Sequence, residues 1–262
     1  MQDLVSIIMP SYNTARYIAD SIRSVQAQTY GNWELLIVDD CSTDDTDGAV
    51  APFLADGRIR YLKNAVNSGA AVSRNYALRE AKGRWIAFLD SDDLWFPEKL
   101  ERQLAFMEET GCHFSYTDYR VCLNGQLQPY AVIGPDVVTR RKMRDYCYFS
   151  TITVIYDREY VGLIQIAPIR KNNDYAMWLQ IIEKTPCYRF PEVLSCYMKH
   201  EGSISSGSKL KLIRWHYVLW HDAQHLDPVS AWVMTLRNLF WGVYKKLHYK
   251  KAIERTNEDD IV

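Results

Sequence analysis

The first 110 residues alternate short apolar runs with stretches of helical spacing, and this alternation constrains the fold more than any other feature. Three apolar runs predict buried strands: residues 4–9, 33–38 and 85–89. Helical spacing is found at residues 14–27, 42–53, 69–81 and 97–110. Asn13 is the predicted cap of the first helix, and Ser42 or Thr43 that of the second. Alternation at this pitch predicts βαβ units and a mostly parallel, doubly wound sheet.

The pattern changes after about residue 111. Further strands are predicted at residues 113–122, 127–132, 151–156 and 193–198, with a helix at 174–184. This mixture predicts a second half of the same domain. From residue 209 the chain is aromatic and basic, with apolar residues at helical spacing.

Composition excludes several classes of protein. The 262 residues carry 31 Lys+Arg and 32 Asp+Glu, so the net charge of −1 does not indicate a nucleic-acid binder. The six cysteines have no CxxC spacing, which argues against a structural zinc site and fits reduced thiols. The N-terminus has no basic region followed by a long apolar segment, and no membrane span is predicted, so we expect a cytoplasmic protein.

An acidic motif, Asp90-Ser91-Asp92, directly follows the apolar run at 85–89. Carboxylates at positions i and i+2 of an extended segment point to the same side. Hard divalent cations take oxygen ligands and are often shared with substrate phosphates, so the pair predicts a metal and diphosphate site. The alternative is a solvated acidic turn before the helix near Pro97, and by itself the motif favours neither.

Other polar groups also fall where predicted strands end or helices begin. Asp39-Asp40 indicates either a turn or carboxylates that accept hydrogen bonds from a base or ribose. Asn67-Ser68-Gly69 precedes a helix, whose N-terminus attracts phosphate, but it is neither GxGxxG nor a P-loop. Taken singly, Asp174 is most simply a helix cap and His200 a polar surface group.

In this order, the motifs resemble those of the family 2 inverting glycosyltransferases of the GT-A fold, above all the bacterial cell-surface polysaccharide members. The matching stretches are 5–13, 33–40, 67–75, 83–93 with Pro97, Asp174 and 200–203. The resemblance implies a GT-A catalytic domain at residues 1–205 and a C-terminal helical extension at 206–262. Its halves would be a nucleotide-binding half, 1–110, and an acceptor half, 111–205.

The resemblance also implies roles for particular residues. The implied nucleotide-sugar site comprises Pro10 and Tyr12 at the uracil, Asp40 at the base, Asp39 and Asp90 near the ribose, and Asn67, Gly69, Arg74 and Ser91 as further contacts. Asp92 would bind Mn²⁺ or Mg²⁺, with His200 at the metal or diphosphate, and Asp93 has no assigned role. Asp174 would be the catalytic base. Many relatives have Glu-Asp where this chain has Asn173-Asp174.

The implied reaction moves a hexose or N-acetylhexosamine from a UDP-sugar and inverts it to a β-glycoside. The implied acceptor is a saccharide on polyprenyl diphosphate, in O-antigen or capsule synthesis. Two alternatives are a non-catalytic sugar-nucleotide binding module and a sugar-1-phosphate nucleotidyltransferase. The second would need a Gly-rich, basic loop after the first strand, and Pro10-Ser11-Tyr12-Asn13 is neither.

The aromatic C-terminal stretch allows two interpretations. Its helices either belong to the core or form a peripheral surface at the cytoplasmic face of the inner membrane. The membrane candidates are Trp215, Trp220, Trp241, Tyr244, Lys245 and Lys246. The sequence leaves open the sugar transferred, the hydroxyl attacked, the preferred metal and the oligomeric state.

Overall fold

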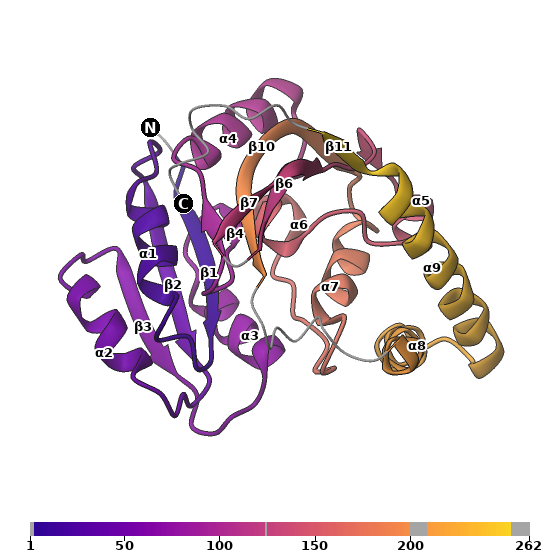
Figure 1. Cartoon of the computed structure of the whole chain (residues 1–262), viewed down its shortest axis with the longest axis horizontal. Coiled ribbons are helices and arrows are strands. Elements are labelled where there is room, and N and C mark those ends of the chain that lie inside the picture. The colour runs from indigo at the N-terminus through magenta and orange to yellow at the C-terminus, as the bar shows by residue number, and fades with distance from the viewer. Residues whose placement is uncertain (1–2, 124, 200–208, 253–262) are drawn as a thin grey trace.

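The computed structural model describes residues 3–123, 125–199 and 209–252, and one curled sheet runs through this part of the chain (Figure 1). The parallel half of the sheet consists of β3 (Ile59–Lys63), β2 (Trp33–Asp39), β1 (Val5–Ser11) and β4 (Trp85–Phe88), in this order. Val5 pairs with Trp33 on one side and with Trp85 on the other. The predicted parallel half is therefore confirmed.

The other half of the sheet is mixed, as predicted. β9 (Val154–Asp157) is antiparallel to both β4 and β6 (Phe114–Leu123), and the long β10 (Cys187–Lys199) is parallel to β6. Two short strands, β5 (Leu94–Trp95) and β8 (Val137–Val138), pair with β10. On the other side of β6, β7 (Gln126–Val132) pairs with β6, and β11 (Lys250–Ala252) pairs with β7. The C-terminal segment thus adds an edge strand to the catalytic sheet.

Helices cover both faces of the sheet, because alternate residues of each buried strand point to opposite sides. Ile7 of β1 packs with α1 (Ile18–Gln26), α2 (Thr46–Val50) and α4 (Lys99–Thr110). Ile8 packs on the other side, in a core that includes α3 (Ala70–Glu80) and α7 (Asn173–Ile181). The shorter helical segments are η1 (Ala51–Phe53), α5 (Arg140–Asp145), η2 (Thr151–Thr153) and α6 (Arg158–Val161).

Both predicted helix caps are wrong, and the reason is the same for each. Asn13 has a φ of 54°, and its side-chain oxygen accepts from Thr43 N at 2.7 Å, so α1 begins only at Ile18. Ser42 turns back to the strand end and donates to Asp39 at 2.5 Å, so Asp45 caps α2 instead. These side chains form hydrogen bonds between the loops after β1 and β2 and do not cap helices.

The C-terminal helices are α8 (Lys209–Val218), a π-helical turn (Leu219–Ala223) and α9 (Pro228–His248), at the right of Figure 1. Trp220 is 1% exposed and donates to the side-chain oxygen of Asn238, so the prediction that it contacts a membrane is wrong. The core interpretation is wrong for Leu236, Phe240 and Val243, which are all more than 60% exposed. Within the described residues, no helix combines the length and apolar character needed to cross a membrane.

Candidate functional site

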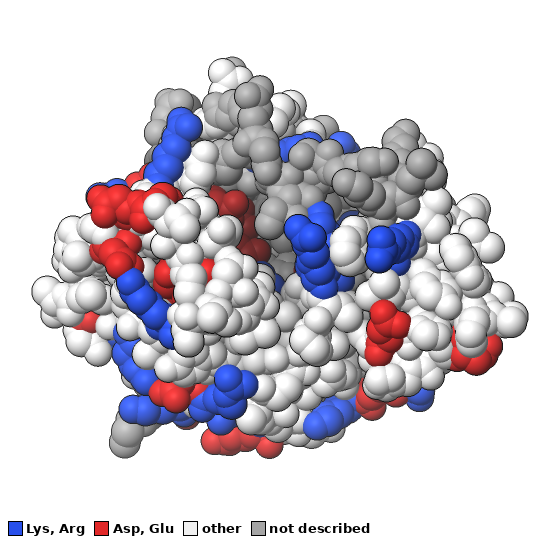
Figure 2. Space-filling view, turned by 90° about the horizontal axis from the view of Figure 1, so that it is seen from below, with Lys and Arg blue, Asp and Glu red and all other residues white. Residues whose placement is uncertain are grey.

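The carboxyl ends of β1, β2 and β4 meet at one edge of the sheet, where ligands of open α/β sheets bind. Figure 2 looks at the molecule from below and shows a hollow in this face, with acidic side chains on its wall. Asp39, Asp40 and Asp90–Asp93 all follow these strand ends. The topology therefore brings together the acidic motifs that the sequence analysis singled out.

Asp40 holds the loop that leads into α3. Its buried carboxylate accepts from Asn64 Nδ2 at 2.7 Å and from the backbone N–H groups of Ser68 at 2.8 Å and Gly69 at 2.6 Å. Asn67 donates to the Asp40 carbonyl oxygen at 3.0 Å, which ties the same loop a second time. Gly69 lies at φ +88°, a conformation that favours glycine. Asp40 thus fixes the N-terminus of α3 beside the strand ends.

The nucleotide-binding candidates on β1 and its loop lie at the same edge. Asp39 is buried and accepts from the backbone N–H of Ser42 at 3.0 Å as well as from its hydroxyl. Pro10 pairs with Val38 within the sheet, and Tyr12 is 48% exposed just beyond the strand. An exposed aromatic ring on a loop pinned at both ends can stack on a planar base.

Arg74 connects the two halves of the site. Its buried guanidinium donates to the Asp90 carboxylate at 2.5 Å and to the Asn173 side-chain oxygen at 3.1 Å. Burial lowers the pKa of Arg74, but the carboxylates of Asp90, Asp174 and Asp92 outweigh it, so the net pKa is raised. Three acidic residues from two distant segments therefore stabilise the positive charge of the Arg74 guanidinium.

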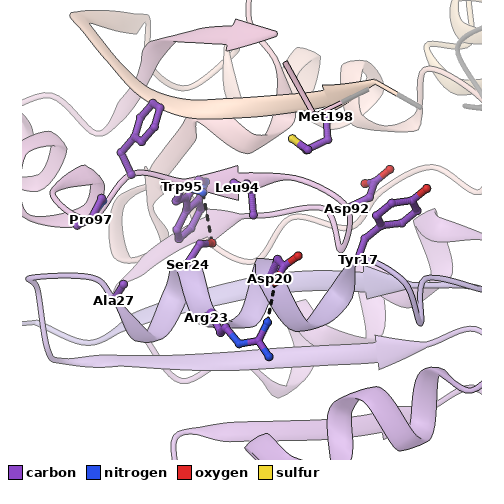
Figure 3. A pocket seen from close by; sticks show the side chains of 12 residues that line it. Tyr17, Asp20, Arg23, Ser24, Ala27, Asp92, Leu94, Trp95, Pro97 and Met198 are labelled. Carbon is purple, nitrogen blue, oxygen red and sulfur yellow. Dashed lines mark hydrogen bonds and ion pairs between the residues drawn. The ribbon is translucent and has the colours of Figure 1, made fainter. Parts of the chain in front are cut away.

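Asp92 and Asp93 have different surroundings. Burial, and then the negative charge of Asp90, raise the pKa of Asp92 to about 6. Asp92 lies with Tyr17 and Met198 at the wall of a cavity of about 480 Å³ beside α1 and β5 (Figure 3). Asp93 is buried and accepts from Met198 N at 2.7 Å, so it joins this loop to β10. That contact gives Asp93 the supporting role that the sequence left undecided.

The chemistry of these side chains fits a divalent cation. Asp90 and Asp92 supply hard oxygen donors, and a cation would relieve the burial of charge that raises the Asp92 pKa. Among the described residues, no three His, Cys, Asp or Glu side chains form a closed metal cluster. An open site of this kind suits a metal that is completed by water and substrate phosphates, with Asp92 as the ligand and Asp90, paired with Arg74, beside it. His200, the other predicted ligand, lies outside the described residues.

Asp174 is the second residue of α7 and faces the same cluster. Its carboxylate accepts from the Thr151 hydroxyl at 2.9 Å and from Tyr175 N at 2.8 Å, one donor on each oxygen. Each carboxylate oxygen has two lone pairs, so both can accept a further hydrogen bond. The sequence predicted a strand at Thr151, which instead begins η2, and it predicted no bond between Asn173 and Arg74. No local pattern signals either contact, because 23 and 99 residues separate the partners.

An open sheet with aspartates and a pinned helix N-terminus at its carboxyl edge is the arrangement with which many α/β proteins bind nucleotides. The chain belongs to glycosyl transferase family 2, whose model matches residues 6–157, more than half of the chain. It is a glycosyltransferase with the GT-A fold, as the sequence resemblance implied.

One similar protein is the UDP-Glc:α-D-GlcNAc-diphosphoundecaprenol β-1,3-glucosyltransferase WfgD of Escherichia coli. It is 40% identical over 244 residues, which span 92% of this chain and 94% of WfgD. The fold is shared with S. aureus TarS 1-349 in complex with UDP-GlcNAc, at a TM-score of 0.69 and 22% identity over 91% of this chain and 72% of that one. It is also shared with the mannosyltransferase PcManGT of Pyrobaculum calidifontis in complex with GDP-Man and Mn²⁺, at a TM-score of 0.61 and 18% identity over 93% of this chain and 76% of that one.

Proposed function

We propose that this glycosyltransferase moves a hexose or N-acetylhexosamine from a UDP-sugar to a saccharide on polyprenyl diphosphate. The product is a β-glycoside in a bacterial surface polysaccharide, O-antigen or capsule. One observation carries the proposal: Arg74 donates to both Asp90 and Asn173. These bonds keep the acidic segment after β4 close to the start of α7, where Asp174 follows Asn173. This link supports a base at Asp174 and a diphosphate site at Asp90–Asp92 on two sides of one hollow.

The donor is assigned to the edge formed by the strand ends. Pro10 and Tyr12 are proposed to line the uracil pocket, with the Tyr12 ring stacked on the base. Asp40 is proposed to accept from the base, and Asp39 to lie near the ribose. Asn67 and Gly69 at the start of α3, with Arg74, Asp90 and Ser91, complete the nucleotide-sugar site. The use of a UDP-sugar is supported by the name of WfgD and by the UDP-GlcNAc complex of TarS.

Asp174 is proposed to act as the general base. An acceptor hydroxyl attacks the anomeric carbon, its proton passes to Asp174, and the bond between that carbon and the diphosphate breaks to release UDP. In-line attack from the opposite side converts an α-linked donor into a β-glycoside. Asp92 and His200 would hold Mn²⁺ or Mg²⁺, which would neutralise charge on the departing diphosphate. Because UDP is a good leaving group, one protein carboxylate suffices.

Contact with the inner membrane is supported by the unusual orientation of α9. Two of its polar residues face the protein: Thr235 and Asn238 are fully buried, and Asn238 donates to the carbonyl oxygens of Arg144 and Asp145. Its large apolar residues face outwards: Val229, Trp232, Val233, Leu236, Phe240, Val243, Tyr244 and Leu247. This outer face of α9 lies on the largely uncharged right-hand side of Figure 2. An exposed apolar stripe of this length is typical of a surface that meets another apolar phase.

The test of the proposed reaction is UDP release with UDP-Glc, UDP-Gal, UDP-GlcNAc and UDP-GalNAc, each with sugar diphosphate lipids as acceptors. We expect release with one donor only when an acceptor is present, and a β-linkage in the product. Release of UDP with no glycoside formed, or an α-linked product, would contradict the proposal.

A further inference from the structure

A second cavity of about 470 Å³ lies where β6, β7 and β10 meet the C-terminal end of α9. Four lysines and five tyrosines dominate its wall: Lys199, Lys245, Lys246, Lys250, Tyr119, Tyr130, Tyr146, Tyr197 and Tyr249. We refer to this cavity as the lysine groove. None of the motifs that carry the family resemblance includes its α9 or β11 residues.

Among the described residues, the wall of the lysine groove carries positive charge and no carboxylate. Its lining contains no Asp or Glu, and within the described ranges none of its four lysines forms an ion pair with a carboxylate. Lys245 donates to the Cys147 carbonyl oxygen at 3.2 Å, and Lys250 lies 4.3 Å from the centre of the Tyr130 ring. A concave site lined by several unpaired ammonium groups attracts an anion, and neighbouring rings can pack against a sugar.

Burial disfavours the charge of Lys245, and a bound anion would stabilise it. Burial lowers the pKa of Lys245 to about 8, so the protein surroundings alone do not fully stabilise this charge. A bound phosphate would supply the missing negative charge, because a charge-assisted hydrogen bond favours the protonated amine.

The lysine groove borders the catalytic hollow. The groove residues Tyr197 and Lys199 flank Met198 on β10, and Met198 lines the cavity beside Asp92. From α9, Asn238 donates to the hydroxyl of Tyr175, the residue that follows Asp174, at 3.4 Å. The Lys245 ammonium lies 5.3 Å from the Tyr146 ring centre. Along α9, the exposed apolar face reaches Leu247, directly before the groove residues Tyr249 and Lys250. The groove thus lies between the proposed membrane face and the proposed base.

We propose that the lysine groove binds the diphosphate of the acceptor, so that the attached sugar reaches Asp174 while the lipid chain leaves along α9. This inference rests on the proposed function, because it takes the acceptor to be a sugar diphosphate lipid. The diphosphate carries two or more negative charges next to the sugar, which matches a site with several ammonium groups beside aromatic rings. Phosphate chemistry is shared by membrane lipid headgroups, and the test must separate the two sources.

The kinetic test uses Lys246→Gln, Lys250→Gln and the double variant. Both side chains are exposed, so the fold should be retained. Each variant is assayed with a water-soluble alkyl sugar diphosphate and with the alkyl glycoside of the same sugar, which lacks the diphosphate. We expect KM for the diphosphate acceptor to rise about tenfold per lysine, as for the loss of one charge-assisted hydrogen bond. KM for the donor and for the glycoside should not change.

Two matched variants serve as controls. Lys82→Gln removes an exposed lysine from the loop between α3 and β4, outside the groove, and should leave all constants unchanged. Lys246→Arg keeps the charge and should restore most of the affinity. An unchanged KM for the diphosphate acceptor in the double variant of an active enzyme overturns the inference and leaves the proposed reaction standing.

A binding measurement keeps the inference testable even if no donor and acceptor pair is turned over. Geranyl diphosphate is titrated calorimetrically into protein saturated with UDP in chelator, so that the donor site and metal do not contribute. We expect binding to wild type that is lost in the double variant. If the double variant binds geranyl diphosphate normally but no longer sediments with phosphatidylglycerol vesicles, the groove is a headgroup site and the inference is wrong.

Discussion

Arg74 donates a hydrogen bond to the side-chain oxygen of Asn173 at 3.1 Å, although the two residues are 99 positions apart in the chain. The same guanidinium pairs with Asp90, so the end of β4 and the start of α7 have fixed positions relative to each other. Asn173 is a neutral amide, so the charge of Arg74 is balanced by the aspartates.

Replacement of Arg74 by Gln should lower both stability and activity. Asp90 would remain close to Asp92 without its cation, and breaking a buried pair in this way costs about 3 kcal/mol. We expect a comparable loss in the free energy of unfolding by urea, and a fall in kcat/KM of about 100-fold because the acidic edge and α7 lose their common anchor. Arg79→Gln, on the exposed side of the same helix, should change neither by more than about 0.5 kcal/mol. Equal effects of the two variants would refute the anchoring role.

Asp174→Asn should reduce kcat by about 10³ while UDP binding, measured by calorimetry, stays the same, because only proton removal is lost. Thr151→Val removes one hydrogen bond to the Asp174 carboxylate and should lower kcat about tenfold through loss of orientation. Undiminished turnover in Asp174→Asn would exclude this residue as the base.

Asp40→Asn should destabilise the nucleotide-binding edge. An amide has one acceptor oxygen, so its NH₂ group would face backbone N–H groups of Ser68 or Gly69 that now donate to a carboxylate. We expect a loss of about 2 kcal/mol in the free energy of unfolding and weaker UDP binding. Asp45→Asn is the control, because asparagine caps a helix as well as aspartate does. Similar stability in both variants would show that the loop does not depend on Asp40.

Removal of divalent metal should abolish glycosyl transfer, and Mn²⁺ or Mg²⁺ should restore it. Asp92→Asn should prevent this restoration, and Mn²⁺ should no longer strengthen UDP binding in calorimetry. Full activity of wild type in chelator would rule out the metal assignment.

Double replacement of Leu236 and Phe240 by Glu should abolish sedimentation with vesicles of phosphatidylglycerol and phosphatidylethanolamine. Both side chains are more than 60% exposed, so Tm should not fall. Leu54→Glu, at an exposed leucine beyond α2, should bind vesicles as wild type does. If wild type is a dimer that this variant dissociates while vesicle binding persists, the outer face of α9 is instead an interface between two copies.

Local patterns in the sequence predicted the parallel half of the sheet because buried strands such as β2 are apolar throughout and are separated by helix-length segments. They also predicted that Asp39, Asp40 and Asp90–Asp92 converge, since parallel strands end at one edge. They failed at Asn13 and Ser42, because a side chain that suits a cap equally suits a bond to another loop, and only proximity in space decides between them.

The sequence by itself determined the family, the acidic strand ends and the existence of an amphipathic C-terminal helix. Tertiary structure alone decided that Arg74 links Asp90 to Asn173, that Thr151 holds Asp174, and that four lysines meet in one groove. It also decided which face of α9 meets the protein. Helical periodicity fixes only that the apolar residues share one side, whereas the bonds from Asn238 to residues more than 90 positions away fix the polar side inwards.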